Sequence, residues 1–248
     1  MQEITYCTNC SVREVRYICS ACWCIGYCSH LCASEMWQKR HSIECNPLVD
    51  VCGENIGTYW SDFREANADL PRVYGANTVS GVAWLVSVPH NTGPVFVLGR
   101  ERGGRYANKY NLFGGAHDKT RSRFETAIAE FNEEFGFAAR FDTPILRDVL
   151  SAPKILMRGT IIILYHCRAN VSRKAWNRAQ RKIMADPNIS RSFKEMDRIQ
   201  LVNDFAMKDA VKHCTTSVVP THPDNTTRIE VSPFVIDVVR SFMNAGYI

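Results

Sequence analysis

The hydrophobic and polar positions of residues 76–248 follow two alternating patterns. Short apolar runs bounded by glycine, proline or asparagine predict β-strands, and the first run is joined to the second by an Asn-Thr-Gly turn at 91–93. Between the runs, apolar residues recur every three or four positions, which predicts amphipathic helices. The predicted strands are 79–89, 95–100, 111–113, 145–151 and 159–168, and the predicted helices are 123–135, 172–185 and 232–245.

Two of the predicted helices differ in the side chains they carry. The helix at 123–135 has a single apolar stripe, and Gly136 is placed to end it. The helix at 172–185 is basic, and the pair Asp186-Pro187 is expected to stop it. Strands and helices in alternation, without an internal repeat, predict a mixed α/β domain.

Cysteine is the unusual feature of the composition, because eight of the 11 cysteines fall within the first 45 residues. Seven of these and one histidine form four pairs with short spacers, so both ligands of a pair can reach one zinc ion at about 2.3 Å. Eight ligands are enough for two tetrahedral zinc ions, and so small a unit needs metal because core burial alone cannot hold it together. The four pairs are Cys7-x2-Cys10, Cys19-x2-Cys22, Cys28-x3-Cys32 and His41-x3-Cys45.

These pairs, together with Tyr27-Cys28-Ser29 and Trp37-x3-His41, resemble a MYND-type zinc finger. In that family the ligand pairs interleave, so the resemblance implies a small two-zinc cross-brace. It also implies a docking surface for short proline-containing peptides, and hence a protein partner. By this resemblance one zinc is held by Cys7, Cys10, Cys28 and Cys32, and the other by Cys19, Cys22, His41 and Cys45.

Charge divides the chain in the same place as the cysteines do. The first 45 residues hold equal numbers of basic and acidic side chains, so the whole formal charge of +5 lies beyond them. Glycines, prolines, acids and aromatic residues then form a segment that is typical of a packed connector. We therefore expect a zinc finger at 1–48, a connector at 49–75 and a larger domain at 76–248.

The composition also excludes several classes of protein. An apolar fraction of 46% with 22% charged residues excludes wholesale disorder. Cysteines crowded at one end, without an export-signal pattern, argue against a secreted disulfide protein. The longest apolar runs are far shorter than the roughly 20 residues of a membrane span. We expect a cytoplasmic protein without a membrane partner, and the nucleus is the alternative compartment.

Three glutamates on the helix at 123–135 form the most informative pattern. Glu130, Glu133 and Glu134 stand at i, i+3 and i+4 and would share one helix face. Such carboxylates repel one another unless a hard cation such as Mg²⁺ or Mn²⁺ neutralises them. The glycine turn before the helix allows a phosphate to approach the backbone. The pattern favours metal-assisted chemistry on a phosphate chain, and a solvated acidic helix face is the alternative.

The same segment resembles the Nudix box, Gly-x5-Glu-x7-Arg-Glu-U-x-Glu-Glu-x-Gly-U, where U is a bulky apolar residue. The resemblance implies an α/β/α sandwich around a mixed sheet, and a hydrolase that cleaves a nucleoside diphosphate linked to another group. It makes Glu130, Glu133 and Glu134 catalytic residues and ligands of Mg²⁺ or Mn²⁺. The matching residues are Gly115, Glu130, Phe131, Glu133, Glu134, Gly136 and Phe137.

Two positions depart from the Nudix pattern. The first Glu of the box falls on Arg121 and its Arg falls on Ala129. In the family these two residues support each other, so their joint loss leaves no unpaired charge, and Arg121 is then able to contact a substrate phosphate. The departure motivates an alternative function, a catalytically degenerate Nudix-fold adaptor that binds RNA or nucleotide and recruits partners through the finger. A transcriptional regulator is a weaker alternative, suggested by the finger alone.

Further site residues are expected on either side of the box. Glu195 follows the basic helix, where Nudix proteins often place a loop carboxylate that acts as general base. An ordinary surface glutamate is the alternative. Phosphate binding is expected from the glycine turn and the basic residues near it, namely Gly114, Gly115, Arg105, Lys119 and Arg121.

A second basic cluster bears on the identity of the substrate. Residues 173–198 hold eight basic side chains against three acids, with Trp176 among them. Such a face is either solvated or holds single-stranded nucleic acid. A bare nucleotide needs only a small pocket, whereas a long basic helix fits a substrate with a trailing backbone better. We therefore expect the 5′ cap of mRNA as substrate, with another nucleotide as the alternative. A Nudix box joined to a zinc finger is similar to mRNA-decapping proteins of large DNA viruses.

Overall fold

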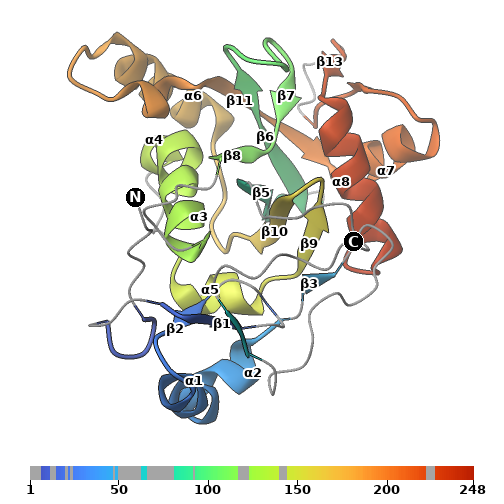
Figure 1. Ribbon diagram of the computed structural model, residues 1–248. Helices are drawn as coiled ribbons and strands as arrows, with labels where there is room; N and C mark the ends of the chain where they lie inside the picture. Colours follow the sequence, from blue (N-terminus) through green and yellow to red (C-terminus); the bar gives the residue numbers. More distant parts are fainter. Residues whose placement is uncertain are drawn as a thin grey trace.

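The computed structural model describes residues 7–11, 15–19, 22, 25–46, 48–49, 63–65, 81–91, 93–116, 123–139, 144–221 and 227–248. A small cysteine-rich unit lies beneath a larger unit built on a β-sheet (Figure 1). Within the described residues, no helix is long and apolar enough to cross a bilayer.

The larger unit is built on an eight-stranded mixed sheet. Six strands form a path in the order β11-β6-β5-β10-β9-β3, while β7 pairs with β6 and β8 with β5. The pairs β5–β10 and β3–β9 are parallel, and the other pairs are antiparallel. The strands are β3 (Leu48–Val49), β5 (Gly81–Val88), β6 (Val95–Glu101), β7 (Tyr110–Asn111), β8 (Phe113–Ala116), β9 (Lys154–Met157), β10 (Thr160–His166) and β11 (Met196–Asn203).

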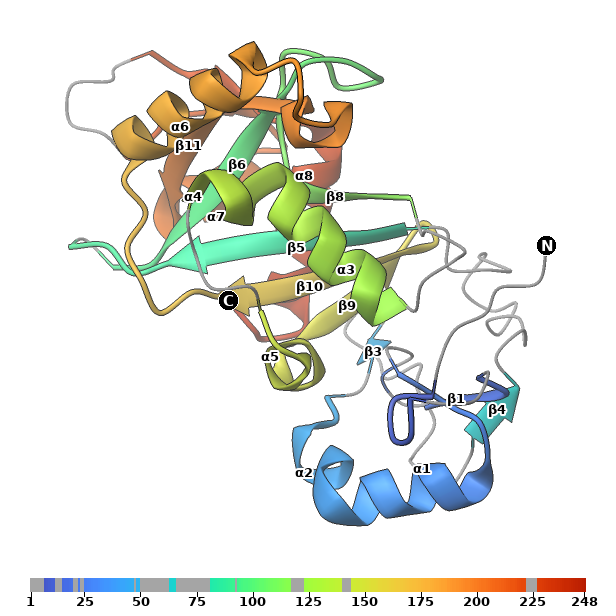
Figure 2. The same ribbon diagram turned by 90° about the vertical axis from the view of Figure 1, so that its left-hand side faces the viewer.

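Helices cover both faces of this sheet, as Figures 1 and 2 show. Every residue of β5 is buried, and alternate side chains enter different cores. Trp84 packs on the side of α3 (Arg123–Phe131) and α6 (Arg173–Ala185). Leu85 packs on the side of α7 (Asp204–Lys212) and α8 (Pro233–Asn244). The predicted α/β/α sandwich with a mixed sheet is therefore confirmed.

The remaining elements are short. They are β1 (Tyr17–Cys19), β2 (Gly26–Tyr27), α1 (His30–Met36), a π-helical turn η1 (Trp37–His41), α2 (Ser42–Glu44), β4 (Phe63–Glu65), a π-helical turn η3 (Asn132–Gly136), α4 (Phe137–Ala139), α5 (Leu146–Ser151), a 3₁₀ turn η4 (Arg191–Lys194), β12 (Ser217–Val218) and β13 (Ile229–Glu230).

The strand predicted at 145–151 was wrong, because these residues form α5. The side chain of Asp148 accepts a hydrogen bond from the backbone N–H of Ile145 at 2.9 Å, which caps the start of a helix. Val149 and Leu150 are fully buried next to one another. Apolar residues at 145, 146, 149 and 150 flank the polar pair Arg147-Asp148, a spacing that suits one face of a helix, and the cap marks where this helix begins.

The prediction that Gly136 ends its helix was also wrong. The chain passes through the π-helical turn η3 and continues as α4. Gly136 does not have the positive φ that a helix-ending glycine usually adopts. A Cβ added at Gly136 would lie 3.0 Å from Asn132 Oδ1 and 3.0 Å from the Phe131 ring, so close packing explains the glycine.

The sequence prediction missed several elements of the larger unit, among them β9, β11 and α7. In β11, charged residues interrupt the apolar ones, so the segment resembles a solvated basic surface in sequence. Helix α7 begins directly after β11, where the side chain of Asn203 accepts from the N–H of Ala206 at 2.6 Å. The predicted helices at 172–185 and 232–245 are confirmed as α6 and α8, with Ser172 and Ser232 as N-caps.

The predicted connector contains β4, while β3 straddles its boundary with the predicted finger. β4 pairs with β1 of the cysteine-rich unit, while β3 pairs with β9 of the large sheet. The two units also meet at Asn46, whose backbone N–H donates to the carbonyl of Leu150 at 2.9 Å. Most of residues 49–75 lies outside the described residues.

Candidate functional site

Two sets of four ligand atoms converge in the cysteine-rich unit. Within each set, the sulfur and nitrogen atoms lie within 4.8 Å of one another. The sets are Cys7, Cys10, Cys28 and Cys32, and Cys19, Cys22, His41 and Cys45. These are the interleaved sets that the resemblance implies.

The distances within the sets suit tetrahedral zinc. Two sulfurs bound at about 2.3 Å to one tetrahedral ion lie about 3.8 Å apart. Cys10 Sγ lies 3.8 Å from Cys28 Sγ, and Cys28 Sγ lies 3.6 Å from Cys32 Sγ. In the second set, Cys19 Sγ and Cys45 Sγ are 3.9 Å apart.

Local structure places the ligands that come from helices. The side chain of Ser29 caps α1 by accepting from the N–H of Cys32, which fixes the turn between Cys28 and Cys32. His41 ends the π-helical turn η1, and its fully buried ring packs edge-on against Trp37 with centroids 5.3 Å apart. His41 Nε2 lies 3.9 Å from Cys22 Sγ.

The electrostatics of the second set also fit a cation. The hydrogen bond with Cys22 is the main cause that raises the pKa of Cys19, and burial raises it further. Hydrogen bonds with Cys19 and Cys22 likewise raise the pKa of Cys45. Thiols packed together stay protonated unless a metal ion compensates the thiolates, so the donor set fits Zn²⁺.

A second candidate site lies in the larger unit, where a pocket of about 620 Å³ is lined by carboxylates, glycines and basic residues. It is formed by the end of β6, the loop after it, β8, η3 and the turn η4. The lining residues are Glu101, Arg102, Gly103, Gly104, Gly114, Glu134, Arg191, Lys194 and Glu195.

Glu134 is the most perturbed carboxylate of this pocket. Its side chain is 4% exposed and accepts a hydrogen bond from the backbone N–H of Gly114 at 2.5 Å. Burial raises its pKa well above the usual value, and the carboxylates of Glu130, Glu195 and Glu101 raise it further. The acids are therefore close enough to influence one another.

The two glycines expected in a turn lie instead within strand β8, which pairs with β5, and there they meet carboxylates of the following helical segment. A Cβ at Gly115 would lie 2.6 Å from Glu130 Oε1, so the glycine leaves the room that this carboxylate occupies. Gly114 has φ +148° and packs its Cα against the backbone of β5 at Val82 and Ala83. The sequence expectation that the glycine turn and the glutamates meet is thus met for Glu130 and Glu134.

Glu133 stands apart from this arrangement. It lies in the π-helical turn η3 and is half-buried; like Glu130 it is not among the described residues that line the pocket, and unlike Glu130 it has no described contact with the glycines. A π turn closes i→i+5 hydrogen bonds, so it changes the helical spacing that the sequence argument assumed. The structure brings Glu130 and Glu134 to the glycines and leaves the role of Glu133 a prediction.

The pocket contains a carboxylate that the sequence analysis missed. Glu101 ends β6, and burial, with a further contribution from Glu195, raises its pKa. The amide of Asn111 donates to Glu101, and Ser232 Oγ donates to Asn111 Oδ1 at 2.7 Å. A lone acid inside the basic run 100–109, at the end of a predicted strand, was the available signal.

Glu195, which the sequence predicted as a general base, lies at the carboxylate pocket. It is exposed, lines the pocket, and follows the turn η4 directly. Its carbonyl accepts from the N–H of Arg102 at 3.0 Å, which ties the loop after β6 to this segment. The structure therefore brings Glu195 to the pocket of Glu134, although the two are far apart in sequence.

The basic residues of the site differ from those expected. Arg102, Arg191 and Lys194 line the pocket, whereas Arg105 is exposed and lies over the ring of Tyr106, 5.6 Å from its centroid. Lys119 and Arg121 lie outside the described residues.

Trp176 does not lie on the surface as its basic neighbours suggested. It is 1% exposed, and its indole N–H donates to the carbonyl of Phe135 at 3.1 Å. A helix with basic residues on one face presents its opposite face to the core, and Trp176 belongs to that opposite face. This residue anchors α6 and is not available for stacking.

The carboxylate oxygens of this site are less closely grouped than the ligand atoms of the two Cys/His sets, but they still suit a hard cation. Among the described residues, only the two Cys/His sets bring three or more ligand atoms within 4.8 Å. Mg²⁺ usually keeps several waters and is held by one or two carboxylates together with substrate phosphates. Glu134, with Glu130, Glu101 and Glu195 around it, offers that kind of donor set.

Comparisons with known proteins give similarities to solved structures. No family model matches the chain, and no curated protein matches it. A MutT/nudix family protein from Enterococcus faecalis is 10% identical over 67% of this chain, with a TM-score of 0.40, and this chain spans only 61% of that protein. The NUDIX domain of Shewanella oneidensis NrtR, solved with ADP ribose, is 11% identical over 70% of this chain and 90% of its own, with a TM-score of 0.38. A C. elegans Ap4A hydrolase is 14% identical over 53% of this chain and 83% of its own, with a TM-score of 0.33.

Proposed function

We propose that the chain is a Nudix-type pyrophosphohydrolase that depends on Mg²⁺ or Mn²⁺. The observation that carries the proposal is the meeting of Glu130 and Glu134 with Gly114-Gly115 of strand β8, beside a pocket that also holds Glu195. The sequence of this segment resembles the Nudix box, and its geometry supports the same chemistry.

The reaction is the hydrolysis of a phosphoanhydride. The oxygen of water forms a bond to phosphorus, the P–O bond to the leaving phosphate breaks, and the proton of the water passes to a base. A bound Mg²⁺ or Mn²⁺ supplies charge stabilisation on the phosphate oxygens and lowers the pKa of the water. The exposed carboxylate of Glu195 is placed to accept the proton. Arg102, Arg191 and Lys194 bind the phosphates.

The substrate that we propose is a nucleoside diphosphate linked to another group, with the 5′ cap of mRNA as the best candidate. A volume of about 620 Å³ accommodates a nucleotide. Positive charge continues from the pocket through Arg191 and Lys194 and along helix α6, which carries five basic and no acidic residues. A bare nucleotide would leave those charges unused, whereas an RNA chain would contact them.

For the cysteine-rich unit we propose a MYND-type finger at 1–48 that holds two structural zinc ions and docks a protein partner. Leu31 and Ile43 on its helices are 69% and 87% exposed, and such apolar side chains suit a short proline-containing peptide. We further propose a connector at 49–75, a Nudix domain at 76–248, and a cytoplasmic location, with the nucleus as the alternative.

Incubation of purified protein with capped RNA, ADP-ribose and dinucleoside polyphosphates in Mn²⁺ or Mg²⁺ tests this function. We expect hydrolysis of capped RNA, and a loss of at least about 100-fold for Glu130→Gln and Glu134→Gln. Glu230→Gln is the matched control, because Glu230 lies on β13 away from the pocket lining. Unchanged turnover in the two pocket variants, or product from none of the substrates, would contradict the proposal.

The alternative function is a binding adaptor that does not hydrolyse its ligand. It is favoured by Ala129, which stands where the Nudix box has Arg, and by Arg121, which stands in place of Glu. Binding of capped RNA without product, under conditions in which the protein holds Mn²⁺, would support the adaptor.

A further inference from the structure

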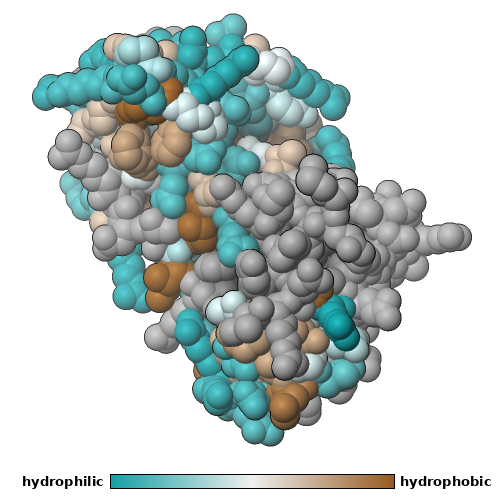
Figure 3. All heavy atoms as spheres, turned by 60° about the vertical axis from the view of Figure 1, so that its left-hand side comes forward, coloured by the Kyte–Doolittle hydropathy of each residue, from teal (hydrophilic) through white to brown (hydrophobic). Residues whose placement is uncertain are grey.

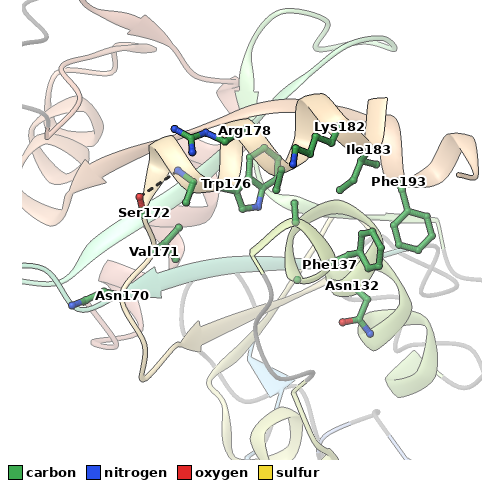
Figure 4. A pocket seen from close by; sticks show the side chains of 14 residues that line it. Asn132, Phe137, Asn170, Val171, Ser172, Trp176, Arg178, Lys182, Ile183 and Phe193 are labelled. Carbon is green, nitrogen blue, oxygen red and sulfur yellow. Dashed lines mark hydrogen bonds between the residues drawn. The ribbon is translucent and has the colours of Figure 1, made fainter. Parts of the chain in front are cut away.

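A second pocket, larger than the first, lies between α6 and the segment that runs from η3 into α4. Its volume is about 1030 Å³, and Figure 4 shows Phe193 at one end and Asn170 at the other. The lining residues are Asn132, Gly136, Phe137, Ala138, Asn170, Val171, Ser172, Ala175, Trp176, Arg178, Ala179, Lys182, Ile183 and Phe193. We call this pocket the α6 groove.

The α6 groove offers aromatic surface to a ligand. Phe137 is 54% exposed, an unusual state for a large apolar side chain. Its ring packs edge-on against the half-buried Phe193, with ring centroids 5.2 Å apart and an interplanar angle of 72° (Figure 4). Ala175 and Ala179, one turn apart on α6, leave the space that longer side chains would fill.

The polar lining of the α6 groove is positive. Arg178 and Lys182 are exposed on α6, one turn apart, and both line the groove. None of the described residues that line it is acidic. In the upper part of the molecule in Figure 3, where α6 lies, hydrophobic residues are bordered by hydrophilic ones. A ligand for this surface should combine negative charge with flat apolar rings.

The α6 groove and the carboxylate pocket share two structural elements. The turn η4 places Phe193 in the groove, and Arg191 and Lys194 in the carboxylate pocket. The π-helical turn η3 likewise places Asn132 in the groove and Glu134 in the pocket. A chain-like anion held at one site can therefore reach the other by crossing η4.

We propose that the α6 groove binds nucleotides of single-stranded RNA. Bases stack on the exposed ring of Phe137 and the neighbouring Phe193, while phosphates contact Arg178 and Lys182. Asn170 offers its amide to a base edge. Binding itself requires no hydrolysis, whereas the idea that this RNA is the body of the cleaved substrate rests on the proposed function.

An acidic peptide would satisfy the positive charge, but the features of the groove favour RNA. Aromatic stacking is available to every base, while side chains of Asp and Glu offer no ring to Phe137. An acidic peptide is therefore an outcome of the test that contradicts the proposal.

Fluorescence anisotropy with a labelled, uncapped single-stranded RNA of about 12 nucleotides, without Mg²⁺ or Mn²⁺, tests the α6 groove independently of catalysis. We expect Phe137→Ala and Lys182→Glu each to raise Kd by about tenfold. Lys182→Glu should also lower the slope of log Kd against log salt concentration by about 0.7 for the lost contact. Because Lys182 is exposed, this variant should fold even if Phe137→Ala does not.

Matched controls come from helix α7, on the other face of the sheet. Phe205 is 78% exposed and Lys212 is exposed, so Phe205→Ala and Lys212→Glu repeat the same chemical changes away from the groove. We expect both to change Kd less than twofold. Equal Kd values for groove and control variants would overturn the proposal, as would displacement of the RNA by a poly-glutamate peptide at the same charge concentration. If the protein hydrolyses capped RNA but the groove variants bind uncapped RNA as well as the native protein does, the proposed function stands and only the RNA-binding role of the α6 groove is wrong.

Discussion

The adjacent residues Gly114 and Gly115 show that identical side chains meet different physical demands. Gly114 has positive φ and lies against the backbone of β5, so an added Cβ would meet atoms that cannot move. At Gly115 the added Cβ would meet the carboxylate of Glu130, the mobile end of a flexible side chain. One glycine is therefore required by the fold, and the other by the position of a carboxylate.

Alanine at these two positions should separate stability from activity. We expect Gly114→Ala to lower the free energy of unfolding by about 2 kcal/mol or more, because both its φ and its packing are unfavourable. Gly115→Ala should cost less than about 1 kcal/mol, yet lower kcat by about 100-fold, because it displaces Glu130.

Thermal unfolding and turnover of the best substrate measure the two effects. The interpretation of the turn would be wrong if Gly115→Ala kept full activity, or if Gly114→Ala were as stable as the native protein.

At the scale of elements, the short helix α5 depends on a lysine from the next strand. Lys154 begins β9 and is fully buried. Its Nζ donates to the carbonyls of Val149, Leu150 and Ala152 at 3.0, 2.8 and 2.7 Å. These carbonyls at the end of α5 lack helical partners, and the ammonium group supplies all three donors.

Lys154→Met should therefore destabilise the larger unit strongly. It leaves three buried carbonyls without these donors, and we expect a loss of about 3 kcal/mol. A loss of this size lowers Tm by about 6–12 °C in a unit of this length. Thermal unfolding followed by circular dichroism measures it.

Lys208→Met is the matched control. Lys208 is partly exposed and forms an i,i+4 ion pair with Asp204 at 2.7 Å. Such a pair contributes less than about 1 kcal/mol, so Tm should change little. A similar Tm for both variants would show that the buried hydrogen bonds of Lys154 do not stabilise α5.

At the scale of the whole molecule, the positive charge and the two Cys/His sets lie in different units. Two Zn²⁺ ions bound by seven thiolates would give the cysteine-rich unit about three additional negative charges. The formal charge of +5 lies entirely in the rest of the chain, where α6 is the most basic element. An anionic substrate is therefore attracted to the larger unit and not to the finger.

Removal of zinc should unfold the finger and spare the large sheet. We expect two zinc ions per chain, and one in each of the variants Cys32→Ser and Cys22→Ser, because these residues belong to different sets. Chelation should raise hydrogen exchange in α1, while β5 and β10 stay protected by their buried positions in the sheet.

Metal analysis and hydrogen exchange check this prediction. Cys214→Ser is the control, because Cys214 is exposed and lies outside both sets, and it should keep two zinc ions. One zinc in the native protein, or loss of protection in β5 after chelation, would contradict it.

The sequence by itself determined the features that depend on near neighbours. The ligand pairs follow from spacers of two or three residues, so the two zinc sets could be expected before any fold was known. The period of apolar residues placed the first two long strands and the helices α3, α6 and α8. The spacing of Glu130 and Glu134 likewise predicted a shared helix face, and both carboxylates meet the two glycines, although these lie in strand β8 and not in a turn.

Only the tertiary structure decided which distant residues meet. Glu101 joins Glu134 because β6 and η3 end at one pocket, and no spacing in the sequence records that. The segment predicted as a strand at 145–151 is capped as helix α5, and the burial of Trp176 left Phe137 as the exposed aromatic residue beside α6. Local patterns are set by interactions between residues that are close in sequence, whereas burial and pocket lining depend on how the whole chain packs.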